Sequence, residues 1–250
     1  MSGDSVTRGP VLVLGGRSDI GLAVAHRFAA AGRPVQLAAR DAAALEADRA
    51  DIALRHGASV TLHEFDALDT AAFGRFLEAL GPLPEVVVCA VGLLGEQGRS
   101  EGDLAEAARV MRSNYEAPAL ILGELANRFA ARGSGVLVGI SSVAGDRGRA
   151  SNYVYGSAKA GFTAFLSGLR NRLAKTGVHV VTVKPGFVAT RMTQGMDLPA
   201  RLTASPDAVA KAIEGAVRRR RDVVYVKPIW ALIMLIIRHL PEPIFKRAKL

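Results

Sequence analysis

The chain of 250 residues carries a formal net charge of +9, and 50% of its residues are hydrophobic. This composition excludes a disordered chain, because so much apolar surface offsets the ordering entropy of folding. A single cysteine, Cys89, excludes a disulfide framework, and the five histidines show no metal spacing, so no bound metal is expected. We expect one globular protein in a reducing compartment such as the cytoplasm.

Short valine-rich segments alternate with longer helical patterns from residue 11 onward. Continuous apolar runs indicate strands that are buried on both faces. The expected strands are Val11–Leu14, Val35–Ala39, Ser59–Glu64, Glu85–Val91, Gly135–Ser141, Val178–Lys184 and Asp222–Val226. The expected helices are Ser18–Ala31, Ala42–His56, Thr70–Leu80, Leu104–Ala131, Ser151–Thr176 and Pro206–Val217. This alternation predicts an α/β three-layer Rossmann fold, a doubly wound parallel sheet of about seven strands.

Glycines stand where five of these helices should stop, which is typical of a helix C-terminus. They are Gly32, Gly57, Gly81, Gly133 and Gly177. In doubly wound sheets, ligands bind outside the carboxyl ends of the strands. The residues directly after each expected strand are therefore the candidates for function.

A glycine-rich turn follows the first expected strand and opens the first expected helix. Small residues there let the backbone approach a pyrophosphate, and the helix N-terminus favours its negative charge. An ordinary strand-to-helix turn is the alternative, but the place between strand and helix favours a dinucleotide site. The candidate cofactor-binding residues are Gly15, Arg17, Ser18, Asp19, Ile20 and Gly21.

The end of the second expected strand bears on which nucleotide is bound. An acidic residue here would bind a ribose 2′-hydroxyl, whereas an arginine accommodates a 2′-phosphate. This chain has Ala39 followed by Arg40, and Arg17 could reach the same phosphate. Arg40 could instead be a solvated charge, and Asp41 could cap the next helix. We expect NADP(H) to be preferred over NAD(H).

A tyrosine and a lysine lie four residues apart in the long helix after the fifth expected strand. Tyr155 and Lys159 therefore share one helical face. A phenol with a pKa of about 10 is a poor acid–base catalyst, and a neighbouring ammonium lowers that pKa. Ser142, at the preceding strand end, could hold a substrate carbonyl against the tyrosine. Tyr153 has no lysine four residues later and is expected to be a packing residue.

These motifs together resemble the short-chain dehydrogenase/reductase family, over about residues 9 to 226. The resemblance implies an NAD(P)(H)-dependent oxidoreductase that interconverts a ketone and a secondary alcohol by hydride transfer, with a tyrosine as general acid. Ser142 lies thirteen residues before Tyr155, which is the family spacing, and is therefore chosen over Ser141. The implied catalytic residues are Asn114, Ser142, Tyr155 and Lys159. The further implied cofactor contacts are Asp66, Ala67, Ala90, Gly92, Pro185, Gly186, Val188 and Thr190, besides Tyr155 and Lys159.

The chain departs from the family pattern at several positions. Asp19 replaces the middle glycine of the glycine motif, and we expect its carboxylate to cap helix amides and to lie near the phosphates. Leu14 replaces the usual threonine, and residues 89–92 replace an Asn-Asn-Ala-Gly segment. Two interpretations from other classes stay open, namely a non-catalytic nucleotide-sensing module and a membrane-associated scaffold.

The C-terminal tail, residues 227–250, follows the expected NADP-binding domain of residues 1–226. Its apolar run Ile229–Ile237 is too short for a membrane span, which needs about 20 residues, but is apolar nearly all round as a helix. Nine basic and two acidic residues lie between Arg218 and Leu250. No nucleic-acid-binding motif accompanies them, so no nucleic-acid partner is expected. The helix should bury itself against the body or a partner subunit, or lie on a membrane surface.

The tail, the glycine turn and residues 91–97 resemble one subgroup of the family more closely, the reductase subunits of decaprenylphosphoryl-ribose 2-epimerases. That resemblance implies a lipid-linked keto-sugar substrate and a separate flavin oxidase partner. It also implies a peripheral position at the inner face of the cell membrane. A small-molecule ketone is the alternative substrate, and a homodimer or homotetramer is expected.

Overall fold

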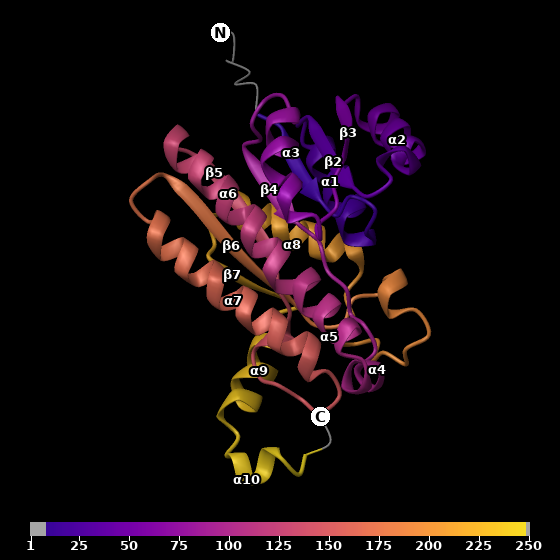
Figure 1. Ribbon diagram of the computed structural model, residues 1–250, viewed down its shortest axis with the longest axis vertical. Helices are drawn as coiled ribbons and strands as arrows, with labels where there is room; N and C mark the ends of the chain where they lie inside the picture. Colours follow the sequence, from indigo (N-terminus) through magenta and orange to yellow (C-terminus); the bar gives the residue numbers. More distant parts are fainter. Residues whose placement is uncertain (1–8, 249–250) are drawn as a thin grey trace.

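The computed structural model describes residues 9–248 and arranges them in three layers around one parallel sheet (Figure 1). The 7-stranded sheet has the order β3-β2-β1-β4-β5-β6-β7, which confirms the predicted doubly wound topology. The strands are β1 (Val11–Leu14), β2 (Val35–Ala39), β3 (Val60–Glu64), β4 (Val86–Cys89), β5 (Gly135–Ile140), β6 (Val178–Pro185) and β7 (Val223–Val226).

Helices cover both faces of the sheet. On one face lie α1, α2 and α8, and on the other lie α3, α6 and α7. The α-helices are α1 (Asp19–Ala30), α2 (Glu46–His56), α3 (Phe73–Ala79), α4 (Gln97–Gly102), α5 (Leu104–Met111), α6 (Ala117–Arg132), α7 (Tyr153–Leu173), α8 (Pro206–Arg218), α9 (Ile229–His239) and α10 (Glu242–Phe245). Short 3₁₀ turns are η1 (Ala42–Leu45), η2 (Thr70–Ala72), η4 (Val143–Gly145) and η5 (Arg191–Thr193).

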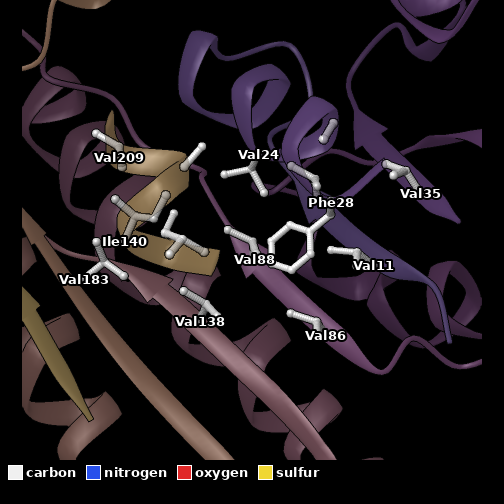
Figure 2. Packing of buried hydrophobic residues seen from close by; sticks show 14 of the residues in the cluster. Val11, Val24, Phe28, Val35, Val86, Val88, Val138, Ile140, Val183 and Val209 are labelled. Atoms are coloured by element: carbon white, nitrogen blue, oxygen red, sulfur yellow. The ribbon is translucent and has the colours of Figure 1, made fainter. Parts of the chain in front are cut away.

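Alternate residues of each central strand point into two separate cores. Val11 and Val13 of β1 pack toward α1 and α8, in the cluster of Figure 2, whereas Leu12 and Leu14 pack toward α3 and α6. All four side chains are fully buried. Helices close both faces of the sheet, and in such sheets ligands bind outside the carboxyl ends of the strands.

The predicted helix Leu104–Ala131 is interrupted by a wider π turn, η3 (Arg112–Glu116), between α5 and α6. Such turns insert a residue into the helix and are frequent at functional sites. Four predicted helix ends are confirmed, since Gly32, Gly57, Gly81 and Gly133 have positive φ at or directly after the C-cap. The fifth is wrong, because α7 ends at Leu173, before the predicted end at Gly177. The helix α4 and the short helix α10 were not predicted.

One face of the tail helix α9 packs on the body of the protein. Trp230, Met234 and Ile237 are buried there, together with Val143 from the loop after β5. The opposite face carries Leu232, Leu235 and Ile236, which are 54%, 55% and 57% exposed. Within residues 9–248, no helix has the length and apolarity that a membrane crossing requires.

The guanidinium of Arg147 attaches the end of the tail to the loop after β5. It donates to the carbonyls of Ile237 and Leu240, each at 2.6 Å, and to the carboxylate of Glu242 at 2.8 Å. It also lies 3.6 Å from the ring centroid of Phe245. The tail is therefore an ordered part of the structure up to residue 248, beyond which Lys249 and Leu250 lie outside the described residues.

Candidate active site

The glycine turn between β1 and α1 forms a cradle in which larger residues would not fit. Ser18 caps α1, because its hydroxyl accepts from the Gly21 amide at 3.0 Å and donates to the Gly15 carbonyl at 2.8 Å. A Cβ on Gly21 would lie 2.5 Å from that carbonyl oxygen. Gly15 has φ +85° and lies against the backbone of Ala90. The backbone can thus approach a pyrophosphate at the start of α1.

A cavity of about 450 Å³ extends from this turn along the ends of β2, β3 and β4. Its size and its place at the sheet edge suit the adenosine half of a dinucleotide. The sequence-predicted residues that line it are Gly15, Arg17, Ser18, Arg40, Asp66, Ala67, Ala90 and Gly92. The residues therefore fit a nicotinamide dinucleotide, and these are the ones that would hold its adenosine and phosphates.

The Arg17 guanidinium lies beside the backbone of Arg40, where a 2′-phosphate would be expected. The Arg17 guanidinium lies 3.4 Å from the Arg40 carbonyl oxygen and 3.6 Å from the Asp41 carboxylate. Asp41 makes no capping hydrogen bond, contrary to the alternative raised above. Glu64 instead accepts from the backbone amides that follow Arg40, which leaves Asp41 beside Arg17.

Asp19 has a different role from the one that its position predicted. It does not cap α1, since Ser18 does. Its carboxylate accepts from the backbone amide of Arg191 at 2.6 Å and from the guanidinium at 2.8 Å. That guanidinium also donates to the Arg17 carbonyl. Asp19 therefore ties the glycine turn to η5 across the mouth of a second cavity.

The second cavity, about 550 Å³, adjoins the first and contains the predicted catalytic residues. Ser142, Tyr155, Lys159 and Asn114 all line it. Ser141 lines it too, but its hydroxyl is bonded to Thr163 at 2.6 Å and to the Lys159 carbonyl at 3.0 Å. The Ser142 hydroxyl accepts from the Ala144 amide at 3.1 Å, which does not use its own proton. The catalytic role of each residue stays a prediction.

Burial sets the ionisation of the tyrosine and the lysine. It raises the pKa of Tyr155 above its usual value, and the Ser142 hydroxyl, as a hydrogen-bonding neighbour, partly offsets this. Burial lowers the pKa of Lys159 to about 8, and a weaker interaction with Cys89 opposes it. The Lys159 ammonium lies 5.7 Å from the centroid of the Tyr155 ring, and burial outweighs the expected lowering of the phenol pKa. Tyr155 therefore keeps its proton at neutral pH, as a general acid requires.

Asn114, which is completely buried, positions the loop after β4. Its amide nitrogen donates to the carbonyls of Leu93, at 2.6 Å, and Val110, at 2.8 Å, and its oxygen accepts from the Leu93 amide at 3.2 Å. A Cβ on Gly92 would lie 3.0 Å from Asn114 Oδ1 and 3.5 Å from Lys159 Nζ. Gly92 is thus packed directly beside the lysine, which the sequence could not show.

The remaining predicted cofactor contacts lie at the end of β6 and in the glycine turn. Ile20, Pro185, Gly186, Val188 and Thr190 all line the larger cavity. Gly186 also accommodates the tail, since a Cβ there would lie 2.0 Å from the Trp230 ring. The residues of this cavity that sequence reasoning missed include Leu93, Arg149, Asn152 and Trp230. Of these, Arg149 and Asn152 could have been predicted, because they lie between Ser142 and Tyr155 in the sequence. No sequence signal pointed to the others.

A dinucleotide cradle that opens onto a buried serine, a buried lysine and a partly buried tyrosine defines a nicotinamide-dependent oxidoreductase site. The model of the short chain dehydrogenase family matches residues 10–199. The chain belongs to the short-chain dehydrogenase family and is an oxidoreductase, which favours the catalytic interpretation over the two non-catalytic ones.

Known proteins resemble the chain over almost its full length. An uncharacterized oxidoreductase of Mycobacterium tuberculosis is 43% identical over 252 residues, covering 98% of each chain. A short-chain dehydrogenase from Sphingobium yanoikuyae, solved in complex with NADPH, has a TM-score of 0.79 at 24% identity and covers 94% of this chain and 97% of its own. A short-chain dehydrogenase from Burkholderia cenocepacia, solved in complex with NADP, has a TM-score of 0.83 at 20% identity and covers 97% of this chain and 98% of its own. At such identities, these two structures show that the fold is shared.

The lowered pKa of Lys159 predicts a pH-dependent stability. Because the folded pKa of about 8 lies below the ordinary lysine value of 10.5, the folded state binds fewer protons than the unfolded chain between these pH values. The cost of burying the charged lysine, about 3 kcal/mol, is therefore complete below pH 8 and is relieved as the pH rises.

Lys159→Met should gain free energy of unfolding relative to wild type at pH 7, and this advantage should shrink by pH 10. Urea unfolding at both pH values measures the difference in free energy of unfolding between variant and wild type, with Lys175→Met at an exposed position as the control. If this difference is the same at pH 7 and pH 10, the pKa of Lys159 is not lowered by burial.

Proposed function

We propose that the protein interconverts a ketone and a secondary alcohol with a nicotinamide cofactor. The observation that carries this proposal is the set of buried Ser142, buried Lys159 and partly buried Tyr155 in a cavity that adjoins the dinucleotide cradle. When bound, the nicotinamide supplies or accepts the hydride. In the direction of reduction, the Ser142 hydroxyl donates to the carbonyl oxygen and orients it, and Tyr155 gives its proton to that oxygen. The proton from Tyr155 prevents a free alkoxide from forming when the hydride adds to the carbonyl carbon.

Lys159 and Asn114 support this proton transfer. The Lys159 ammonium donates to the Ile140 carbonyl at 3.0 Å, which fixes it beneath Tyr155 at the end of β5. It is placed to hold the nicotinamide ribose and to stabilise the phenolate that remains after the proton has left. Asn114 keeps Gly92 against the lysine and is proposed to hold a water through which the proton is replaced.

Replacing Tyr155 with phenylalanine tests the general acid. The ring and its packing remain, but the proton donor is lost, so turnover of any accepted ketone should fall about 100- to 10,000-fold. Cofactor binding, followed by NADPH fluorescence, should be retained. Tyr153→Phe, an exposed position in the first turn of the same helix, serves as the control and should keep full activity. Near-wild-type turnover by the Tyr155→Phe variant with cofactor bound would falsify the assignment.

NADP(H) is the proposed cofactor. Arg17 and Arg40 both line the smaller cavity beside Ala39, which offers no carboxylate to repel a 2′-phosphate. The Sphingobium and Burkholderia structures, which contain NADPH and NADP, share this fold. The Asp41 carboxylate near Arg17 opposes the phosphate, so Arg40 is the main determinant.

Replacing Arg40 with alanine should raise the KM for NADPH about 10- to 100-fold, which is the loss of a charge-assisted hydrogen bond. The KM for NADH, which lacks the 2′-phosphate, should change by less than about threefold. Steady-state kinetics with both cofactors measure the change in each KM. The exposed Arg75→Ala on α3 is the control for a general loss of positive charge. Equal effects of Arg40→Ala on the two cofactors would overturn this assignment.

The tail supports a finer proposal, that the substrate is a lipid-linked ketone taken from an anionic membrane surface. The exposed apolar face of α9 (Leu232, Leu235, Ile236) and Ile244 of α10, 58% exposed, have basic neighbours. These cations are Lys227, Arg238, Lys246 and Arg247. An apolar helix face with basic flanks binds a lipid interface through buried area and charge. Because Trp230 of the same helix lines the larger cavity, such a surface would lie next to the substrate site.

Substituting serine for Leu232, Leu235 and Ile236 together tests the membrane surface without removing Trp230, as a truncation would. Wild-type protein should sediment with phosphatidylglycerol-containing vesicles, less so at high salt, and not with phosphatidylcholine alone. The triple variant should remain in the supernatant and keep its turnover of a small ketone. Leu54→Ser, an exposed leucine on α2, is the control. If wild type never sediments and the triple variant has a smaller mass in solution, the face is instead the expected homo-oligomer interface.

A further inference from the structure

An acidic side chain lies in the part of the cavity where the cofactor phosphates are expected. Arg17 and Ser18 line both cavities, so the glycine turn stands at their junction. The pyrophosphate joins the two halves of a dinucleotide and would therefore cross this junction. Asp19, the next residue, is the one carboxylate among the described residues that line the larger cavity. Without a partner, this carboxylate would repel a negatively charged ligand.

Arg191 of η5 binds both oxygens of this carboxylate. Its backbone amide donates to Asp19 Oδ2 at 2.6 Å, and its Nε donates to Asp19 Oδ1 at 2.8 Å. Its Nη2 donates to the backbone carbonyl of Arg17. The guanidinium therefore lies directly against the glycine turn, although 172 residues separate Arg191 from Asp19 in the chain.

Hydrogen bonds within the loop after β6 hold Arg191 in this place. The Thr193 hydroxyl accepts from the Thr190 amide at 3.1 Å and donates to the Val188 carbonyl at 2.6 Å, which fixes the backbone on both sides of Arg191. The side chain of Arg191 is 65% exposed, and so exposed an ion pair contributes little to folding. An anionic ligand at the junction of the cavities gives a stronger reason for the pair than the stability of the fold does.

We propose that Arg191 neutralises Asp19 and thereby allows the cofactor pyrophosphate to bind beside an acidic residue. The two side chains act as one neutral unit, so the phosphates do not meet an unbalanced carboxylate. Arg191 is thus a positioning residue that acts through Asp19. A glycine at position 19, as in the family pattern, would need no such partner. This inference rests on the proposed NADP(H) cofactor.

A double-mutant cycle tests the pairing through the Kd of NADPH, followed by its fluorescence. Arg191→Met leaves the carboxylate unbalanced and should weaken NADPH binding about 10- to 100-fold, with a smaller loss at high salt. Asp19→Asn removes the charge and keeps an oxygen that can accept from the amide of residue 191. The double variant Asp19→Asn/Arg191→Met should therefore bind NADPH within about threefold of wild type. The control Arg128→Met, which breaks the ion pair with Glu124 on α6 outside both cavities, should leave the Kd unchanged.

Adenosine 2′-phosphate separates the proposed role from a general disturbance of the site. It carries the 2′-phosphate but no pyrophosphate, so its Kd, measured by calorimetry, should be the same in wild type and in Arg191→Met. An unchanged NADPH affinity in Arg191→Met, a loss that persists in the double variant, or an equal loss for adenosine 2′-phosphate would each overturn the pairing. If wild type binds neither NADPH nor adenosine 2′-phosphate, the cofactor proposal itself fails, which is a result distinct from these three.

Discussion

The functional end of this protein depends on an ammonium group that has almost no contact with water. Lys159 is 3% exposed, and its amine is held by the carbonyl of Ile140 at the end of β5. A buried charge is tolerated only where polar groups surround it. The loop after β4 packs close to the Lys159 amine, which requires a glycine at position 92. Asn114 holds the backbone of this loop in place through its hydrogen bond to the Leu93 carbonyl. Asn114 itself lies in the π turn η3.

The second constraint is closure of the cavity by segments that are far apart in the chain. Asp19 ties η5 to the glycine turn, and Trp230 packs against the backbone of Gly186 and donates to the Leu202 carbonyl at 3.1 Å. Arg147 then fixes the tail to the loop that follows Ser142. The loop after β5 therefore carries the proposed catalytic hydroxyl and an anchor for α9 within a few residues. A change in the tail would be transmitted directly to the cavity wall.

Features that depend on local sequence could be predicted, and features that depend on distant contacts could not. The strands, the glycine helix ends and the shared face of Tyr155 and Lys159 follow from spacing within one element. The pair Asp19–Arg191 spans 172 residues, so a carboxylate in the glycine turn looked like a helix cap. The pKa of Tyr155 was also misjudged, because the sequence shows a nearby lysine but not the burial that outweighs it. The two faces of α9 could not be separated until its packing partner was known.

These constraints together favour an amphipathic substrate. An apolar cavity wall excludes water and strengthens the few polar contacts within it, but it gives little discrimination between similar apolar chains. Discrimination must then come from the polar groups at one end of the cavity, Ser142 and Tyr155. A small polar ketone would leave the apolar wall uncovered, whereas a ketone that carries an apolar chain fills both parts of the cavity.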